Sequence, residues 1–382
     1  MRSKQISILF AGGGTGGHLY PAVAVADELR KLSDNVEIVF AGTNGKIESR
    51  VVPELGYKFA PIWISGFRRR FSVENLVFPL KLSVSFVQSF FLIRKCRADV
   101  VVGTGGYVSG PVVFVASLLG VPTLIQEQNS YPGLTTRLLA SRADQVHLTF
   151  EASAKYLRRK DNIRFTGNPT RESVGTITKE TGRHFFNLHP ERLTLLVFGG
   201  SQGAGSMNKA MFSHLDQITQ QGVQVIWQTG VEAYESARAL VKWGNSELTP
   251  TVRVYPFIEQ MEFAYGACDL AVCRAGATTL AELTRGGVPS ILVPYPHAAA
   301  DHQTENARTM VEAGASLMLR DDELPERFMD TIMALLFDEE RMRRMSERAK
   351  SLSRPDAAKK LAREILALAE ADNAERREGL QV

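Results

Sequence analysis

The sequence predicts an α/β protein made of two similar halves, each with a parallel sheet covered by helices on both faces. The main observation is a repeated pattern: an apolar strand, a glycine-rich turn and a helical stretch. It occurs at residues 6–17 and again at residues 193–205, nearly half a chain apart. This pattern opens a doubly wound α/β unit. A length of 382 residues also suits two domains better than one.

Further strands are predicted in both halves by short apolar runs that lie between helical patterns. In the first half we expect them at residues 36–41, 100–102, 123–125 and 145–148. In the second half we expect them at residues 223–228, 270–273 and 290–293. Strands that alternate with helices pair in parallel, so both sheets should be parallel and buried on both faces.

The most apolar longer stretch, residues 76–93, is interrupted by Pro79, Lys81 and Gln88. A spanning helix needs ~20 mostly apolar residues. We therefore expect a helix on or within a domain, and not a transmembrane span. The apolar run at residues 6–11 is too short for the core of a signal peptide, and none is expected.

A domain boundary is predicted near Gly167 and Pro169, because these residues follow one α/β set and precede the second. We expect an N-terminal domain at residues 1–166 and a second domain at residues 167–350. Apolar residues at helical spacing predict a last helix within residues 351–382. We expect this helix to pack back on the N-terminal domain.

The charge and cysteine content exclude several classes of protein. A net charge of +4 is too small for a dedicated nucleic-acid binder, so no nucleic-acid partner is expected. The three cysteines, Cys96, Cys268 and Cys273, form no CxxC pair and lack nearby histidines. We therefore expect a reduced, cytosolic protein in which the cysteines pack in the core.

The first glycine loop, residues 12–17, fits the pattern GxGxxG. Glycine lets the backbone approach a ligand, and the helix that follows suits an anion, although a tight turn without a ligand has the same pattern. A dinucleotide site also needs an acidic residue at the end of the second strand, and neither Thr43-Asn44 nor Gln228-Thr229 offers one. The chain also lacks GxxxxGK[ST]. Nicotinamide or flavin oxidoreductases and P-loop hydrolases are therefore disfavoured.

Two later segments have the composition of ligand-binding loops at the carboxyl ends of strands. Residues 103–111 combine four glycines with Tyr107 and Ser109. Residues 273–283 open a helix with small residues after a glycine turn, and its N-terminus can meet a diphosphate. Glu282, one turn further in, can accept both hydroxyls of a ribose. An acid that only favours the helix dipole is the alternative for this residue.

Six motifs that follow one another along the chain give a more specific indication. They are Gly13-Gly14-Thr15-Gly16-Gly17-His18, Gly105-Gly106-Tyr107-Val108-Ser109-Gly110-Pro111, Glu127-Gln128-Asn129, Gly167-Asn168-Pro169, Gly199-Gly200-Ser201-Gln202-Gly203-Ala204, and Arg274-Ala275-Gly276-Ala277 with Glu282. In order and spacing they resemble the MurG family of bacterial transferases, which add N-acetylglucosamine (GlcNAc) to the lipid-linked muramyl peptide of the cell wall. One departure is Gln126, where the family often has histidine.

The resemblance implies a GT-B fold, in which two Rossmann-like domains with parallel sheets face across a cleft, and UDP-GlcNAc as the donor. By motif match, Ile258 would meet the uracil through its backbone, Glu282 would hold the ribose, and Gln303 would bind GlcNAc hydroxyls. The full set implied for the donor is Thr15, Gly16, Gly17, Asn129, Arg171, Ser201, Ile258, Ala277, Thr278, Thr279, Leu280, Ala281, Glu282 and Gln303. The residues assigned to the acceptor side are Gly105, Gly106, Tyr107 and Ser109.

The implied reaction moves GlcNAc, with inversion, to the C4 hydroxyl of lipid I, undecaprenyl-diphospho-MurNAc-pentapeptide. The product would be lipid II for peptidoglycan synthesis. His18 is favoured as the general base because histidine titrates near neutral pH, and Glu127 is the second candidate. A histidine that only braces the loop remains the alternative. No DxD-like motif is found, so no cofactor or tightly bound metal is expected, and loosely bound Mg²⁺ stays open.

Because the implied acceptor carries a lipid, we expect a peripheral protein on the cytoplasmic face of the cell membrane. The Phe-Arg-Arg-Arg-Phe run at residues 67–71 would meet an anionic surface, at about 1 kcal/mol per charge. The apolar stretch after it could enter the interface, although a solvated loop over a core helix is the alternative. Three other functions stay open: a UDP-GlcNAc 2-epimerase, another glycolipid transferase of this fold, and a non-catalytic sugar-nucleotide-binding subunit.

Overall fold

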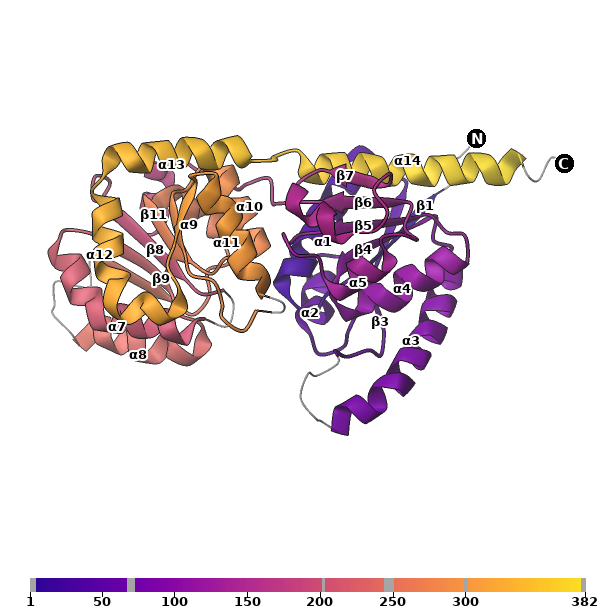
Figure 1. The fold of residues 1–382 in the computed structure, drawn as a ribbon, viewed down its shortest axis with the longest axis horizontal. Coiled ribbons are helices and arrows are strands. Elements are labelled where there is room, and N and C mark those ends of the chain that lie inside the picture. Colours follow the sequence, from indigo (N-terminus) through magenta and orange to yellow (C-terminus); the bar gives the residue numbers. More distant parts are fainter. Residues whose placement is uncertain (1–4, 67–72, 201–202, 244–250, 299–300, 379–382) are drawn as a thin grey trace. The chain divides into compact units, whose positions relative to one another are not determined.

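The computed structural model describes residues 5–66, 73–200, 203–243, 251–298 and 301–378. The chain divides into two compact units, one of Met1–Thr170 with Arg354–Val382 and one of Arg171–Ser353. Figure 1 shows a twisted sheet with helices around it in each unit. The boundaries expected from the sequence, 166/167 and 350/351, lie a few residues before the two points at which the chain changes unit.

A parallel sheet with the strand order β3-β2-β1-β4-β5-β6-β7 forms the centre of the first unit. Its strands are β1 (Ile6–Gly12), β2 (Val36–Gly42), β3 (Lys58–Pro61), β4 (Val100–Gly105), β5 (Thr123–Glu127), β6 (Gln145–Leu148) and β7 (Ile163–Phe165). The register places Ile8 of β1 opposite Ile38 of β2 and Val100 of β4. The predicted parallel arrangement is confirmed.

Helices cover both faces of this sheet. They are α1 (Gly16–Leu32), α2 (Ile47–Glu54), α3 (Val73–Cys96), α4 (Gly106–Leu118), α5 (Leu134–Leu139), α14 (Ala357–Glu378) and the 3₁₀ helix η1 (Glu151–Tyr156). Successive β1 side chains point to opposite faces, so Leu9 joins the core beneath α3 and α4 whereas Phe10 joins the core beneath α1 and α14. Helix α14 contributes Leu361 and Ile365, both buried, to the second of these cores.

Helix α3 has two apolar faces. One face packs on the core of the first unit through Phe78, Leu82 and Phe86. The other lies about 160° round the helix axis, at 3.6 residues per turn. It exposes the large apolar side chains Leu76, Leu80, Val87 and Phe91. By length and composition alone, α3 is the one described helix that could cross a membrane, and 17% of its most apolar window is buried. The basic run at residues 67–71 lies outside the described residues.

The second unit repeats the architecture with the parallel strand order β10-β9-β8-β11-β12-β13. Its strands are β8 (Thr194–Phe198), β9 (Gln224–Gln228), β10 (Val252–Tyr255), β11 (Leu270–Cys273), β12 (Ser290–Leu292) and β13 (Ser316–Met318). Its helices are α6 (Lys179–Phe185), α7 (Gly205–Gln220), α8 (Val231–Trp243), α9 (Met261–Ala267), α10 (Ala277–Gly286), α11 (His302–Glu312), α12 (Leu324–Leu336), α13 (Glu339–Leu352) and the 3₁₀ helix η3 (Asp321–Glu323).

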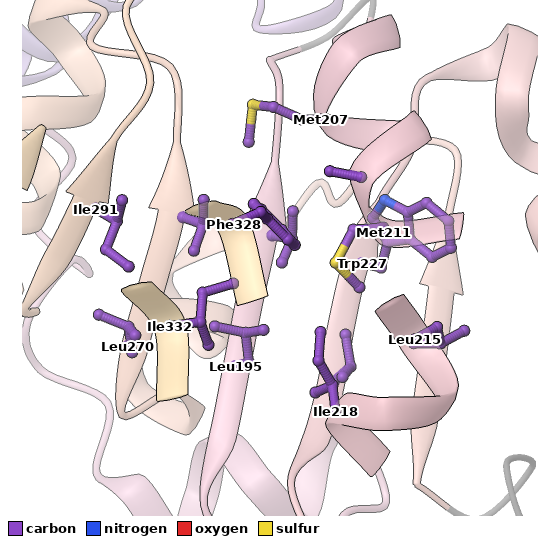
Figure 2. Close-up of a cluster of buried hydrophobic side chains, with 14 of the residues drawn as sticks. Leu195, Met207, Met211, Leu215, Ile218, Trp227, Leu270, Ile291, Phe328 and Ile332 are labelled. Carbon is purple, nitrogen blue, oxygen red and sulfur yellow. The ribbon is translucent and has the colours of Figure 1, made fainter. Parts of the chain in front are cut away.

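One large apolar cluster fills the space between this second sheet and the helices on one of its faces. Figure 2 shows Leu195 and Trp227 of the sheet beside Met211 of α7 and Phe328 of α12. Trp227 is fully buried, and its indole N–H donates to Oδ1 of Asn208 at 3.1 Å. The indole therefore fills the core without leaving its single polar group unpaired.

Candidate functional site

The strand order reverses at one place in each sheet, between β1 and β4 in the first unit and between β8 and β11 in the second. In open α/β sheets, ligands bind beyond the carboxyl ends of the strands at this switch point. Four glycine-rich segments of the sequence begin at or just after the carboxyl ends of these four strands, at residues 12–17, 103–110, 199–205 and 274–276. The topology therefore gathers them into one candidate site in each unit.

The two glycine loops of the first unit touch each other. Gly105 and Gly106 have φ angles of +99° and +79°, which L side chains rarely adopt. A Cβ atom at Gly106 would collide with the carbonyl oxygen of Gly13, and one at Gly105 would lie 2.5 Å from Nδ1 of His18. Glycine at both positions is therefore what lets the β4 loop lie against the β1 loop and the His18 ring.

A buried carboxylate, which the sequence analysis did not single out, fixes the first glycine loop. Glu48 is 1% exposed, and its two oxygens accept from the N–H groups of Gly14 at 2.9 Å and Thr43 at 3.0 Å. The Gly14 N–H is therefore already hydrogen-bonded to Glu48, whereas in a phosphate-binding loop this N–H would be available to the ligand. The exposed start of α1 remains, where Thr15 is the N-cap residue and its side chain makes no capping bond.

The remaining acceptor-side residues differ in exposure. Tyr107 is 57% exposed and stands at the start of α4. Ser109 is buried, and its hydroxyl oxygen lies 2.5 Å from where a Cβ atom at Gly103 would be, so this side chain packs against β4. Of the two, only Tyr107 presents its side chain to solvent.

Glu127, the second candidate for the general base, is buried at the end of β5. Its Oε1 accepts from the backbone and side-chain N–H groups of Asn129, at 3.1 and 3.2 Å. Its Oε2 accepts from the Gly133 N–H at 3.0 Å. Because both oxygens are engaged by the following loop, the geometry favours a supporting role and leaves His18, which is partly exposed, as the stronger candidate.

In the second unit, helix α10 begins directly after the turn that follows β11. Gly276 is its N-cap residue and makes no side-chain cap, so the first N–H groups point beyond the strand ends. The hydroxyl oxygen of Thr278 is buried and has no hydrogen-bond partner among the described residues. Thr279 and Ala281 are partly exposed, whereas the side chains of Ala277 and Leu280 pack inward. Contacts of Leu280 with a ligand would therefore involve its backbone.

Glu282 lies in this helix, one turn beyond the start, and is buried. Its Oε2 accepts from the Tyr265 hydroxyl at 2.9 Å, and its Oε1 lies 3.7 Å from Nη2 of Arg171. Burial raises the pKa of Glu282, against the lowering effect of Arg171 and of the Tyr265 hydrogen bond. Burial, with the neighbouring Glu282, also raises the pKa of Tyr265. The carboxylate is therefore held in place before any ribose arrives.

Gln228, at the end of β9, is a second residue whose role the sequence analysis did not find. Its Nε2 donates to the Gly200 carbonyl at 2.9 Å, and its Oε1 accepts from the Ile258 N–H at 2.8 Å. It thus joins the second glycine loop to the residue expected to meet the uracil. A base contact through the Ile258 N–H would have to replace the Gln228 bond. Ser201 lies outside the described residues.

Helix α11 and the segment before it are hydrogen-bonded to the residues that follow β11 and β12. Gln303 is partly exposed, and its Oε1 accepts from the Tyr295 N–H at 2.9 Å. Asn306 is buried and donates from Nδ2 to the Ala275 carbonyl at 3.1 Å. Arg274 donates to the carbonyls of Val293 and Pro294. These bonds hold Gln303 close to the start of α10 within the second unit.

The candidate residues fall into two groups. The first unit holds Thr15, Gly16, Gly17, His18, Gly105, Gly106, Tyr107, Glu127 and Asn129, and the second holds Arg171, Ile258, Glu282, Gln303 and the start of α10. Within the described part of the chain, no three His, Cys, Asp or Glu side chains lie close enough together to hold a metal ion.

Comparison with protein families gives two matches that together cover most of the chain. The model described as glycosyltransferase family 28 N-terminal domain matches residues 8–148. The model described as glycosyltransferase family 28 C-terminal domain matches residues 194–361. Each match includes both switch-point loops of one unit.

Several named relatives are similar to this chain over nearly their whole length. Proteins of Salinibacter ruber and Chlorobaculum tepidum are 44% and 47% identical over 371 and 368 residues, which is 97% and 95% of this chain and 99% of each relative. Both are named UDP-N-acetylglucosamine–N-acetylmuramyl-(pentapeptide) pyrophosphoryl-undecaprenol N-acetylglucosamine transferase. The solved structure of MurG of Acinetobacter baumannii is 26% identical, with a TM-score of 0.73 over 95% of this chain and 99% of that one.

Proposed function

The chain belongs to glycosyltransferase family 28, and from that premise we propose that it transfers GlcNAc from UDP-GlcNAc to the C4 hydroxyl of lipid I. The observation that carries this assignment is the near-full-length similarity to transferases with that activity in their names. The product is lipid II, so the enzyme is a UDP-GlcNAc-dependent hexosyltransferase of peptidoglycan synthesis. The switch-point residues are chemically suited to both substrates.

The second unit binds the donor in this proposal. Glu282 accepts from the two ribose hydroxyls, and the Ile258 backbone meets the uracil. The N-terminal amides of α10, with the hydroxyls of Thr278 and Thr279, meet the diphosphate. The unpartnered oxygen of Thr278 supports this arrangement, because a buried hydroxyl without a partner is costly unless a ligand supplies one. Arg171 and Gln303 complete the set.

The first unit binds the acceptor and supplies the base. The muramyl O4 attacks C1 of GlcNAc while the bond from C1 to the diphosphate oxygen breaks, so the configuration inverts and UDP leaves. The proton of the attacking hydroxyl passes to the imidazole of His18. The exposed ring of Tyr107 and the loop at Gly105 and Gly106 border the acceptor. Thr15 to Gly17 and Asn129 are the residues of this unit that we assign to the donor.

We propose that no tightly bound metal takes part, because helix N-terminal amides and hydroxyls can meet the charge of the departing diphosphate. Adding a chelator to the assay should then leave turnover within about twofold, whereas a metal-dependent transfer step loses most of its rate acceleration.

We also propose that the protein is peripheral and meets the cytoplasmic face of the membrane through α3. One face of this helix packs on the core of its own unit, so lipid cannot surround it as it would a spanning helix. The opposite face presents Leu76, Leu80, Val87 and Phe91, which can enter the interface. Lys81 lies 5.8 Å from the ring centre of the exposed Trp63, a pairing suited to the boundary between lipid and water.

The test is turnover of radiolabelled UDP-GlcNAc with a short-chain lipid I analogue. We expect label in the lipid product, with loss of kcat in His18→Ala and a raised KM for UDP-GlcNAc in Glu282→Ala. Binding of UDP-GlcNAc without transfer would contradict the proposal and indicate a sugar-nucleotide-binding subunit. Conversion of the donor to its C2 epimer, without labelled lipid, would indicate an epimerase.

A further inference from the structure

The His18 ring has one hydrogen-bond partner of particular interest, the side chain of Gln128. Nδ1 of His18 lies 3.1 Å from Oε1 of Gln128. His18 is in the first turn of α1, and Gln128 follows β5 directly and is 2% exposed. Because a neutral imidazole carries its proton on either nitrogen, the catalytic question is which nitrogen keeps a lone pair.

The orientation of the Gln128 amide answers this question, because its second terminal atom, the one that does not face His18, is surrounded by hydrogen-bond acceptors. Nε2 of Gln128 lies 2.8 Å from the Thr104 carbonyl oxygen and 3.3 Å from the Gln126 carbonyl oxygen. Carbonyl oxygens accept and never donate, so the NH₂ group of the amide must face them. The opposite orientation would bring three oxygens together in a buried site. The amide oxygen therefore faces the imidazole, and Nδ1 of His18 must be the donor.

A chain of hydrogen bonds holds the amide in this orientation. Nε2 of Gln128 also donates to Oε1 of Gln126, and Nε2 of Gln126 faces Oγ1 of Thr149 at 3.5 Å and Oδ1 of Asn168 at 3.3 Å. Thr149 Oγ1 in turn donates to the Glu127 carbonyl at 3.0 Å. The branch through Thr149 ends on a backbone carbonyl, which cannot reverse its role, so the amides of Gln128 and Gln126 each have one favourable orientation.

The charged groups on the elements around this ring are engaged elsewhere. Glu48 of α2 accepts from two backbone N–H groups, and Glu127 of β5 accepts from the loop that follows it. Tyr107 of α4 is turned towards solvent. Gly105 also lies beside the ring, and a Cβ atom at that position would be 2.5 Å from Nδ1.

We propose that Gln128 is a positioning residue that holds His18 in the Nδ1–H tautomer. Nε2 of His18 then carries the lone pair that takes the proton of the attacking hydroxyl. A carboxylate here would orient the ring in the same way but would also favour the protonated imidazolium, which cannot accept a proton. The amide orients the ring without adding charge. Gln126 supports Gln128, which gives this departure from the family's usual histidine a structural role. The catalytic part of this inference rests on the proposed function, whereas the tautomer does not.

The tautomer can be measured directly by long-range ¹H–¹⁵N NMR of the full chain labelled at histidine. The chain has seven histidines, and His18→Gln identifies the signals of His18. At alkaline pH we expect Nδ1 of His18 to show the shift of a protonated nitrogen and Nε2 that of an unprotonated one. A proton on Nε2 would overturn the proposal whatever the enzyme's activity. A clear Nδ1–H signal with no transferase activity would instead contradict the proposed function alone.

Two substitutions separate orientation from charge. Gln128→Met keeps the side-chain length but removes the acceptor, so His18 should lose the Nδ1–H preference, and kcat should fall roughly tenfold or more, with the KM for UDP-GlcNAc within about threefold. Gln128→Glu keeps an acceptor towards Nδ1 but replaces the NH₂ group by an oxygen beside the Thr104 and Gln126 carbonyls, so kcat should fall. The Nδ1–H signal should persist, and the acid limb of the kcat profile should move to higher pH because a carboxylate favours the imidazolium. Unchanged tautomer and kcat in Gln128→Met would refute the positioning role.

A matched control accounts for lost stability. Asn162 is another buried amide of the first unit, and it donates to the carbonyls of Ala140 and Ala143. Asn162→Leu removes a similar pair of amide-to-backbone bonds far along the chain from His18. It should lower the thermal midpoint about as much as Gln128→Met while leaving the His18 signals and kcat within about twofold. If both variants lose kcat equally, the loss in Gln128→Met is structural and the proposal fails.

Discussion

Replacing Glu282 by glutamine removes one negative charge and preserves the shape of the side chain. This carboxylate accepts from the Tyr265 hydroxyl and lies near Arg171. With the donor bound, we expect it to accept from two ribose hydroxyls. Hydrogen bonds to a charged acceptor contribute about 1.5–3 kcal/mol. Glu282→Gln should therefore lower kcat/KM for UDP-GlcNAc roughly 10- to 150-fold, mainly through KM.

The same substitution should not destabilise the protein at neutral pH. Burial raises the pKa of Glu282 in the folded protein, so the folded chain binds this proton more readily than the unfolded chain does. The free energy of unfolding therefore falls as pH rises past the unfolded value, because the buried group must ionise. Glutamine carries no such cost. A thermal midpoint at or above that of wild type, measured at pH 8, would separate lost binding from lost folding.

Glu262 provides a matched control, because its carboxylate lies 3.5 Å from Nη1 of the same arginine but on α9. Glu262→Gln removes an equal charge beside Arg171 and should change the KM for UDP-GlcNAc less than about threefold. An unchanged KM in Glu282→Gln would refute the ribose contact. An equal rise in both variants would show that only the net charge near Arg171 matters.

Three further predictions concern stability and membrane binding. The pKa of the buried His147 is lowered to about 4 by desolvation and a nearby arginine. Lowering the pH from 6.5 towards 4 should therefore reduce the free energy of unfolding by up to about 3 kcal/mol. Chemical denaturation of His147→Leu should lack this pH-dependent loss of stability. Gly106→Ala should lower the free energy of unfolding by about 2 kcal/mol or more, because the new Cβ atom would collide with the Gly13 carbonyl oxygen and because the φ angle of residue 106 is +79°. A thermal midpoint equal to that of wild type would contradict the close approach of the loops. The double variant Leu80→Ser, Phe91→Ser should bind anionic vesicles roughly 30-fold or more weakly in a sedimentation assay. Its turnover of a water-soluble acceptor should be unchanged. Undiminished vesicle binding would exclude α3 as the membrane contact.

The central strands of both sheets were predictable from the sequence, and the edge strands were not. All four edge strands, β3, β7, β10 and β13, were missed. Three of them, β3, β7 and β10, contain a charged residue, namely Lys58, Arg164 and Arg253, and all four are short. An edge strand is covered on fewer sides than a central one, so its sequence need not be continuously apolar. The apolar runs that identify buried strands are therefore absent where the sheets end.

The backbone elements of the candidate site were also predictable, because glycine loops follow the strands at the switch points. The side chains that organise those loops were not. Gln128 bonds to His18 across 110 positions, Gln228 bonds to Ile258 across 30, and Glu48 holds a loop 34 residues before it. Such partners are brought together by the sheet topology and leave no local spacing pattern. Gln128 was visible within the Glu-Gln-Asn motif, but nothing in the sequence indicated which group it would face.

The position of α14 has a consequence for the order in which the protein can be made. A ribosome releases residues 171–353 before the helix that covers Phe10 and the apolar face of α1. The first unit, although its sheet is synthesised first, therefore still lacks part of its cover while residues 171–353 are being made. A nascent chain arrested shortly after residue 353 would present an uncovered apolar stripe at its N-terminal end. Truncation of the last 29 residues would thus first destabilise the unit at the opposite end of the polypeptide, which contains residues 1–170.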